Sequence, residues 1–219
     1  MTLELGVLVS GGGSNLEAIL AAIADGRLDA RCRLVLSNRP AVFALERARA
    51  AGVPSVVVDH KQYPTRDAFG RAALVELRAH GVEWLALAGF MRVLSADFLA
   101  AFPGRVVNIH PSLLPAFPGV AAQKQAYDAG VKLAGCTVHF VDAGVDSGPI
   151  IAQSSVPVLE SDSAEDLRLR ILEQEHVLFP RALQWIAEGR VQVVSRAGAR
   201  DIVAIAPEGK TSIAEVKER

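Results

Sequence analysis

Residues 7–23 read VLVSGGGSNLEAILAAI, and the order of apolar residues and glycines in this segment indicates how the fold begins. Val7 to Ser10 form an apolar run that is typical of a buried strand, and the glycines at residues 11–13 end it. Apolar residues at helical spacing follow at positions 16, 19, 20 and 23, before Asp25 and Gly26 end the pattern. The segment therefore predicts a strand, a tight glycine turn and a helix.

The same alternation continues outward along the chain. Further strands are predicted at residues 34–36, 56–58, 85–88 and 106–109, and helices at residues 43–51 and 66–80, with a short helix capped by Ser95. Strands that alternate with helices indicate an α/β protein. We therefore predict an open, mostly parallel, doubly wound sheet of the Rossmann-like class.

The second half of the chain follows a different order. A short helix is predicted at residues 123–128, two strands at residues 136–141 and 150–158, and a β-hairpin from two stretches at residues 191–194 and 202–205. Between them, Ser163 and Asp166 resemble a capping box that opens a long helix, which Pro180 is expected to kink or break.

We divide the chain into a main domain and a small appendage. The main domain covers residues 1–190, and a C-terminal hairpin and tail cover residues 191–219, packed on or near it. A chain of 219 residues has the length of one domain of this kind.

The composition fits this fold and excludes several classes of function. Apolar residues make up 51% and aromatic residues 5% of the chain, as in a sheet covered by Ala-rich helices. The net charge is −1, and no basic stripe suited to nucleic acid is present. No apolar run approaches the roughly 18 residues of a membrane span, and Cys32 and Cys136 lack a CxxC partner. We therefore expect a cytoplasmic protein with reduced thiols and no nucleic-acid or membrane partner.

The glycine turn is a candidate phosphate site. Glycines allow the backbone to approach a ligand, and the N-terminus of the following helix offers unpaired amides and a positive dipole end. The turn matches neither GxGxxG nor a P-loop, which disfavours dinucleotide and nucleoside triphosphate binding. A tight turn with no ligand is the alternative that the residues leave open.

Residues 106–119, VVNIHPSLLPAFPG, carry the candidate chemistry. Asn108 and His110 are two residues apart on a predicted strand, so they project from the same face. An amide can donate a hydrogen bond to an oxyanion, and an imidazole can supply or remove a proton near neutral pH. A strand-end histidine with its hydrogen bonds satisfied, followed by a proline-stiffened turn, is the alternative.

The loop at residues 142–148 supplies a candidate partner for this histidine. Asp146 would favour the charged imidazole and orient its ring if it faced His110; otherwise it serves ordinary turn chemistry. His139 is expected to be a core histidine, and no pair of histidines has metal-ligand spacing. We therefore expect no metal.

Four segments together resemble one family. They are residues 9–16 (VSGGGSNL), 88–94 (AGFMRVL), 108–115 (NIHPSLLP) and 135–149 (GCTVHFVDAGVDSGP). In order and spacing, from about residue 5 to residue 190, the chain is similar to the glycinamide ribonucleotide (GAR) transformylases of purine synthesis. The element at residues 108–115 marks the wider formyltransferase superfamily, and the first segment narrows the resemblance to the GAR enzymes and their nearest relatives.

The resemblance implies an enzyme that transfers the formyl group of 10-formyltetrahydrofolate, its co-substrate, to the amine of GAR. Asn108, His110 and Asp146 would be the catalytic residues. The other implied contacts, carried over from the family, are Gly13, Ser14 and Asn15 for the GAR phosphate, Glu175 for its ribose, and Arg66, Met91, Arg92, Val93, Leu94, Asn108, Val141, Asp142 and Asp146 for the folate. The partners would be these two small molecules, and the protein a monomer or a homodimer.

The sequence differs from the family at one notable position, and three other functions are alternatives to GAR formylation. Ala121 stands where the family usually has a histidine, which puts that histidine's part in ordering the loop or in proton transfer in doubt. Methionyl-tRNA formyltransferases add a basic C-terminal domain, and formyltetrahydrofolate deformylases an N-terminal regulatory domain, and we expect neither here. A non-catalytic phosphate- or nucleotide-binding module on the same fold is the rival from another class.

Overall fold

The structure is a computed structural model that describes residues 1–210. The chain divides into two compact units, residues 1–108 and residues 109 onward. The predicted division into residues 1–190 and 191–219 stays a prediction, and residues 211–219 of its tail lie outside the described residues.

The first unit alternates strands and helices, as the sequence predicts. Its elements are β1 (Leu3–Val9), α1 (Ser14–Ala24), β2 (Ala30–Ser37), α2 (Phe43–Ala50), β3 (Ser55–Val57), the short helical turn η1 (His60–Gln62), α3 (Arg66–Ala79), β4 (Trp84–Leu87), α4 (Ala96–Ala100) and β5 (Val106–His110), whose last two residues belong to the second unit.

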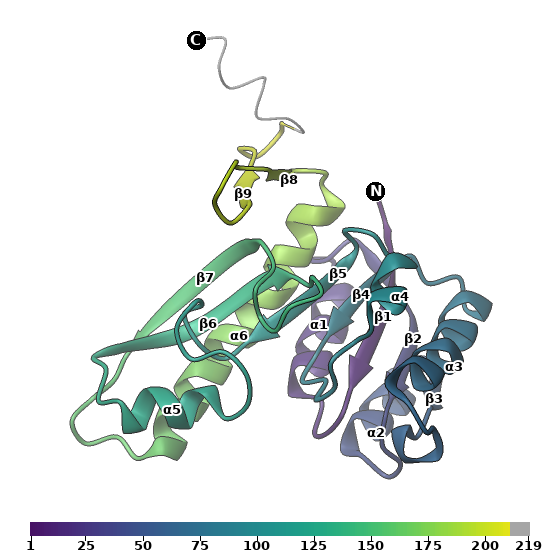
Figure 1. Cartoon of the computed structure of the whole chain (residues 1–219), viewed down its shortest axis with the longest axis horizontal. Helices are drawn as coiled ribbons and strands as arrows, with labels where there is room; N and C mark the ends of the chain where they lie inside the picture. Colours follow the sequence, from purple (N-terminus) through teal and green to yellow (C-terminus); the bar gives the residue numbers. More distant parts are fainter. Residues whose placement is uncertain (211–219) are drawn as a thin grey trace. The chain divides into compact units, whose positions relative to one another are not determined.

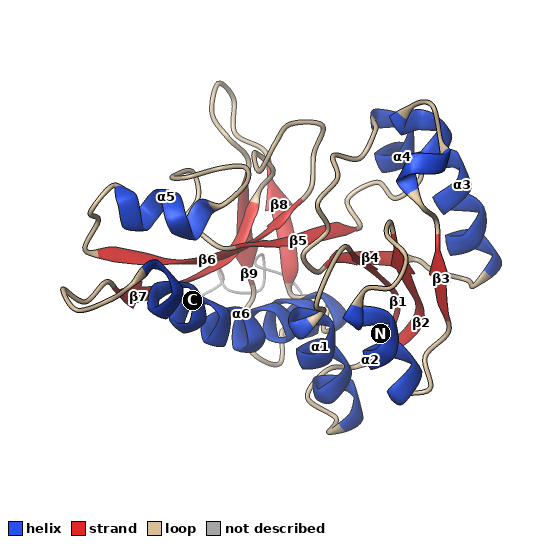
Figure 2. Cartoon of the chain, turned by 90° about the horizontal axis from the view of Figure 1, so that it is seen from below, coloured by secondary structure: helices blue, strands red, loops and turns tan. Residues whose placement is uncertain are grey.

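Strand β1 lies in the middle of this unit. It pairs in parallel with β2 on one side and β4 on the other, while β3 pairs with β2 and β5 with β4. Helices α1 and α2 cover one face of these strands, and α3 and α4 cover the other (Figure 1, Figure 2). Leu3, Leu5 and Leu8 of β1 are fully buried, because a strand between two layers of helices has no face in water.

The second unit is built around an antiparallel pair of strands. Its elements are α5 (Ala122–Asp128), β6 (Leu133–Phe140), β7 (Ile150–Pro157), α6 (Ala164–Ala187), β8 (Val191–Val194) and β9 (Ile202–Ile205). Strand β6 pairs with β7, helix α6 packs against both, and β9 of the β8–β9 hairpin contacts β7. The predicted hairpin is therefore present.

The strand order across the sheet is β3-β2-β1-β4-β5-β6-β7, and β8-β9 form a separate two-stranded sheet. The order reverses beside β1, whose neighbours β2 and β4 lie on opposite sides, as in a doubly wound sheet. The predicted α/β class, a mostly parallel sheet with flanking helices and a small C-terminal hairpin, is confirmed.

The predicted capping box opens α6, and of the kink or break expected at Pro180 the break is absent. The Ser163 hydroxyl accepts from the Asp166 N–H, and the Asp166 carboxylate accepts from the Ser163 N–H. Pro180 lies inside one continuous helix of 24 residues. The helix tolerates it because Phe179 and Leu183, on either side, are fully buried, and their packing offsets the cost of the lost backbone hydrogen bond.

Candidate active site

The glycine turn positions the N-terminus of α1. Gly13 occupies its cap position with a φ of 76°, a left-handed conformation that a residue with a Cβ rarely adopts. A Cβ built on Gly13 would lie 2.6 Å from the Cβ of Ala44, so α2 also requires glycine here. Because Gly13 has no side chain to accept from the first-turn amides of α1, these amides suit an anionic ligand.

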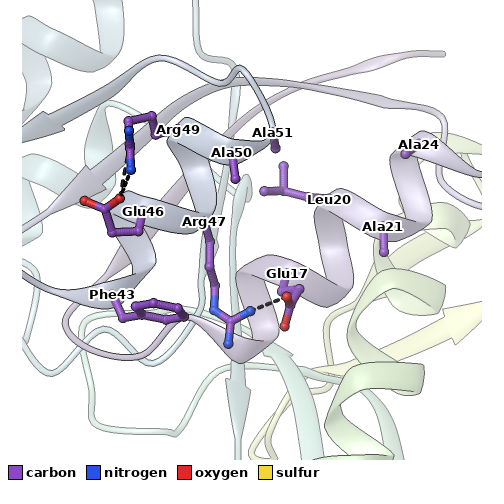
Figure 3. A pocket seen from close by; sticks show the side chains of 10 residues that line it. All are labelled: Glu17, Leu20, Ala21, Ala24, Phe43, Glu46, Arg47, Arg49, Ala50 and Ala51. Carbon is purple, nitrogen blue, oxygen red and sulfur yellow. Dashed lines mark hydrogen bonds and ion pairs between the residues drawn. The ribbon is translucent and has the colours of Figure 1, made fainter.

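Two residues of helix α2 donate hydrogen bonds to the backbone of this turn. The Ala44 N–H donates to the Gly11 carbonyl oxygen over 3.1 Å, and the Arg47 Nε donates to the Gly12 carbonyl oxygen over 3.0 Å. The Arg47 guanidinium also forms an ion pair with Glu17 of α1 and lies over the ring of Phe43 (Figure 3). The turn therefore has a fixed backbone before any ligand binds.

The groove beside Arg47 does not contain the predicted site. It lies between α1 and α2 and has a volume of about 590 Å³ (Figure 3). Its lining residues are Glu17, Leu20, Ala21, Ala24, Phe43, Glu46, Arg47, Arg49, Ala50 and Ala51, none of which the sequence analysis assigns to substrate.

Ser10 links the ends of three strands of the first unit, and the sequence analysis missed this role. Its hydroxyl donates to the Asn38 side-chain oxygen after β2 over 2.6 Å and accepts from the Met91 N–H after β4 over 2.8 Å. Both polar side chains are buried. An open α/β sheet binds its ligand at the carboxyl ends of its strands, and Ser10 orders these ends within the first unit.

The predicted folate residues of the first unit lie on exposed or rim positions. Arg66 is exposed at the first turn of α3. In the loop after β4, Met91 and Arg92 are exposed, Val93 is 48% exposed, and Leu94 is buried. Val93 is therefore the apolar side chain that could contact the folate, while the buried Leu94 packs the loop against the core.

Asn108 and His110 lie on β5, as predicted. Asn108 is half-buried, and His110 is 5% exposed at the strand's end. The His110 Nε2 contacts the Phe117 carbonyl oxygen at 2.9 Å, and its Nδ1 lies 3.4 Å from Asp146 Oδ2. Both partners are acceptors, so only the imidazolium form can present an N–H to each. Two hydrogen-bond acceptors therefore face the two ring nitrogens of His110.

Asp146 is held in place by its loop. It adopts a left-handed φ of 52°, and its Oδ2 accepts from the Gly119 N–H over 2.8 Å. Its Oδ1 lies 3.7 Å from His139 Nε2. The neighbouring Asp142 is exposed and closes the loop internally, accepting from the Gly144 N–H and the Ser147 hydroxyl. The structure therefore brings Asp146 to His110, the arrangement that spacing alone left open.

His139 is buried, as expected, but it also faces the candidate site. Its Nδ1 donates to the Phe140 carbonyl oxygen over 2.8 Å. Burial lowers the pKa of His139 below its ordinary value, against the opposing effects of the Phe140 hydrogen bond and the Asp146 charge. His139 therefore stays neutral near pH 7 and adds no second positive charge beside Asp146.

Thr137 and Gln153 order the loop that follows His110, and the sequence analysis missed both. The Thr137 hydroxyl donates to the Ser112 carbonyl oxygen over 2.6 Å and accepts from the Leu114 N–H over 3.0 Å. The Gln153 amide donates to the Leu114 carbonyl oxygen. Ala121 is the N-terminal cap residue of α5, with a φ of 56° and no side-chain hydrogen bond.

Glu175 lies 5% exposed in α6, and its negative charge acts on Cys136 of β6. Burial, and to a smaller extent this charge, raises the pKa of the Cys136 thiol to about 12. Burial alone raises the pKa of the Cys32 thiol to about 12 as well. Both thiols are free and protonated at neutral pH, which excludes them as nucleophiles.

Within residues 1–210, no group of three or more His, Cys, Asp or Glu side chains is placed so that it could hold a metal ion. No helix in this range is both long and apolar enough to cross a bilayer.

A family model, described as formyl transferase, matches residues 4–183. The chain belongs to the formyl transferase family. Among curated relatives, the phosphoribosylglycinamide formyltransferase of Bacillus subtilis is 44% identical over 181 residues, which are 83% of this chain and 93% of that protein. The solved glycinamide ribonucleotide transformylase 1 of Symbiobacterium toebii is 51% identical, with a TM-score of 0.90 over 94% of this chain and 95% of that one.

This formyl transferase family member also resembles a part of much longer proteins. The trifunctional purine biosynthetic protein adenosine-3 of Drosophila pseudoobscura pseudoobscura is 48% identical over 204 residues, which are 91% of this chain. The matched region is only 15% of that protein. The chain thus corresponds to one segment of the trifunctional relative.

Proposed function

We propose that this formyl transferase family member transfers the formyl group of 10-formyltetrahydrofolate to the amine of GAR, giving formyl-GAR and tetrahydrofolate in purine biosynthesis. The observation that carries the proposal is the arrangement on and beside β5. His110 is held between Asp146 and the Phe117 carbonyl, and Asn108 lies two residues earlier on the same face of the strand.

The chemistry of this arrangement suits acyl transfer. The GAR amine attacks the formyl carbon, and the carbonyl oxygen becomes an oxyanion in a tetrahedral intermediate. The Asn108 amide donates a hydrogen bond to this oxyanion. The His110 imidazolium stabilises it through its charge, and Asp146 keeps that charge in place. Breakdown of the intermediate re-forms the carbonyl and breaks the bond between the formyl carbon and the folate nitrogen; this nitrogen keeps the electron pair and takes up a proton, and the GAR nitrogen, which became positively charged on attack, gives up a proton.

Proton delivery by His110 requires one change of partner. Its Nε2–H is donated to the Phe117 carbonyl oxygen, so this hydrogen bond must be exchanged for one to the substrate when a proton is transferred. The single Ser112 hydroxyl hydrogen is directed mainly at the Ala116 carbonyl oxygen, over 2.6 Å, and reaches the Phe117 carbonyl oxygen only over 3.3 Å, so His110 is the main donor to Phe117. Catalytic hydrogen bonds of this kind often form only with substrate bound.

Substrate contacts follow the same proposal. The GAR phosphate binds at Gly13, Ser14 and Asn15, supported by the position of these residues at the N-terminus of α1, where the cap residue Gly13 has no side chain, and Glu175 contacts the ribose. The folate contacts are those that the resemblance implies, Arg66, Met91, Arg92, Val93, Leu94, Asn108, Val141, Asp142 and Asp146. The proposed partners are these two small molecules, with no metal, nucleic acid or membrane, for a cytoplasmic monomer or homodimer.

A steady-state assay tests the proposal. Release of tetrahydrofolate is followed with both substrates, and formyl-GAR is quantified in parallel. We expect release that requires GAR and matches formyl-GAR one for one. His110→Ala abolishes it, while His80→Ala, at the C-terminal cap of α3, does not. Folate release without GAR would indicate a deformylase, and no turnover by the wild type would favour the non-catalytic binding module.

A further inference from the structure

The β8–β9 hairpin reaches the loop that carries Asp146. Arg200, in the segment that joins β8 to β9, directs its guanidinium at this loop. Its Nη2 donates to the Asp146 carbonyl oxygen over 3.3 Å and to the Gly148 carbonyl oxygen. One terminal nitrogen therefore bridges the backbone on both sides of Ser147.

The hairpin is fixed well enough to hold this contact. Strand β9 contacts β7, and buried Ala206 exchanges hydrogen bonds with Arg190, its N–H donating to the Arg190 carbonyl and its carbonyl accepting from the Arg190 Nε over 2.7 Å. Arg200 therefore acts on the loop from an anchored element.

The loop needs such support because its backbone is unfavourable at Asp146. A non-glycine residue at positive φ is strained and persists only when its surroundings fix it. The Gly119 hydrogen bond holds the Asp146 carboxylate, but it does not hold the backbone. Arg200 donates to the two carbonyl groups that define this part of the backbone.

We propose that Arg200 is a positioning residue for formyl transfer, which fixes the backbone of Asp146 so that its carboxylate meets His110. This inference rests on the proposed function, in which Asp146 keeps His110 charged. It assigns the hairpin a part in the reaction that the sequence analysis did not give it.

The test compares Arg200→Ala with Arg200→Lys and with Arg196→Ala, a matched control that removes a guanidinium whose side-chain bonds stay inside the hairpin. Arg200→Ala removes the hydrogen bonds to both carbonyl groups, and we expect kcat to fall at least about tenfold, the effect of losing one hydrogen bond to a charged donor. The KM for GAR should change less than about twofold, since the proposed phosphate contacts are in the glycine turn. Arg200→Lys should recover part of kcat, and Arg196→Ala should stay near the wild type.

A second measurement does not depend on activity. Amide hydrogen exchange in residues 142–149 should be faster in Arg200→Ala than in the wild type and unchanged in Arg196→Ala. Wild-type kcat and exchange in Arg200→Ala would overturn the inference, and so would equal losses in Arg200→Ala and Arg196→Ala. If the wild type itself shows no GAR-dependent turnover, the proposed function fails, and hydrogen exchange still decides whether Arg200 fixes the loop.

Discussion

Replacing Gly13 by Ala tests whether the glycine turn is both a structural and a binding element. An alanine at this position must adopt the left-handed φ of 76°, and its methyl group would lie 2.6 Å from the Cβ and 2.8 Å from the Cα of Ala44. Ala44 is fully buried, and its N–H is bonded to the Gly11 carbonyl oxygen, so the backbone of α2 has little freedom to move away.

The cost follows from these two effects. Left-handed backbone costs a residue with a Cβ about 1–2 kcal/mol, and forcing a methyl group into a packed site costs about 1–3 kcal/mol. We therefore expect Gly13→Ala to lower the free energy of unfolding by about 2–5 kcal/mol. A displaced turn also loses at least one amide bond to the phosphate, which predicts a KM for GAR raised about 10- to 100-fold.

Urea unfolding and steady-state kinetics measure the two effects separately. Gly12→Ala is the matched control for stability, because its Cβ would have nothing within 4 Å and its φ is outside the left-handed region. It should unfold at about the wild-type urea concentration. Equal stability of the two variants would refute the steric argument. A destabilised Gly13→Ala with an unchanged KM for GAR would instead remove the turn from phosphate binding.

Three further variants test the catalytic residues and one buried ion pair. Asn108→Ala should lower kcat about 10²- to 10³-fold, as loss of one oxyanion donor does, with an unchanged melting temperature; a wild-type rate would exclude Asn108 from the chemistry. Asp146→Asn should lower kcat, because the His110 ring loses the carboxylate that lies 3.4 Å from its Nδ1; a wild-type kcat would leave Asp146 a loop residue. The Arg170 guanidinium lowers the pKa of Asp162 from 3.8 to about 2, so this pair stabilises the fold fully above about pH 4 and less as the pH falls toward 2. Asp162→Asn should therefore be less stable at pH 7 and lose less stability over that acid range in urea unfolding, and parallel curves for the two proteins would contradict this.

Local pattern predicted the fold because each element carries its own periodicity. The apolar run of β1, the glycine turn and the helical spacing of α1 are all readable within residues 3–24. The absence of a break at Pro180 could not be predicted from local sequence, because it depends on the apolar face that α6 buries against β6 and β7. Tertiary packing of that face outweighs the proline.

The candidate site was only partly predictable, because its contacts join distant residues. Asn108 and His110 share a strand, so their common face followed from the period of two. The approach of Asp146 to His110 depends on the connection between β6 and β7, which spacing does not determine. Ser10 and Thr137 act through partners far along the chain, and a buried hydroxyl at a strand end is a weak signal without those partners.

The low reactivity of the two buried thiols allows site-specific fluorescent labelling of this protein. With the pKa of both Cys32 and Cys136 raised to about 12, only about one thiol in 10⁴ is ionised at pH 8, and the thiolate is the form that alkylating dyes attack. A single cysteine placed at an exposed position, such as Val120 in the loop before α5, would then take up a fluorophore selectively without removing either native residue. Its emission would record, in real time, how that loop responds as each substrate binds and each product leaves.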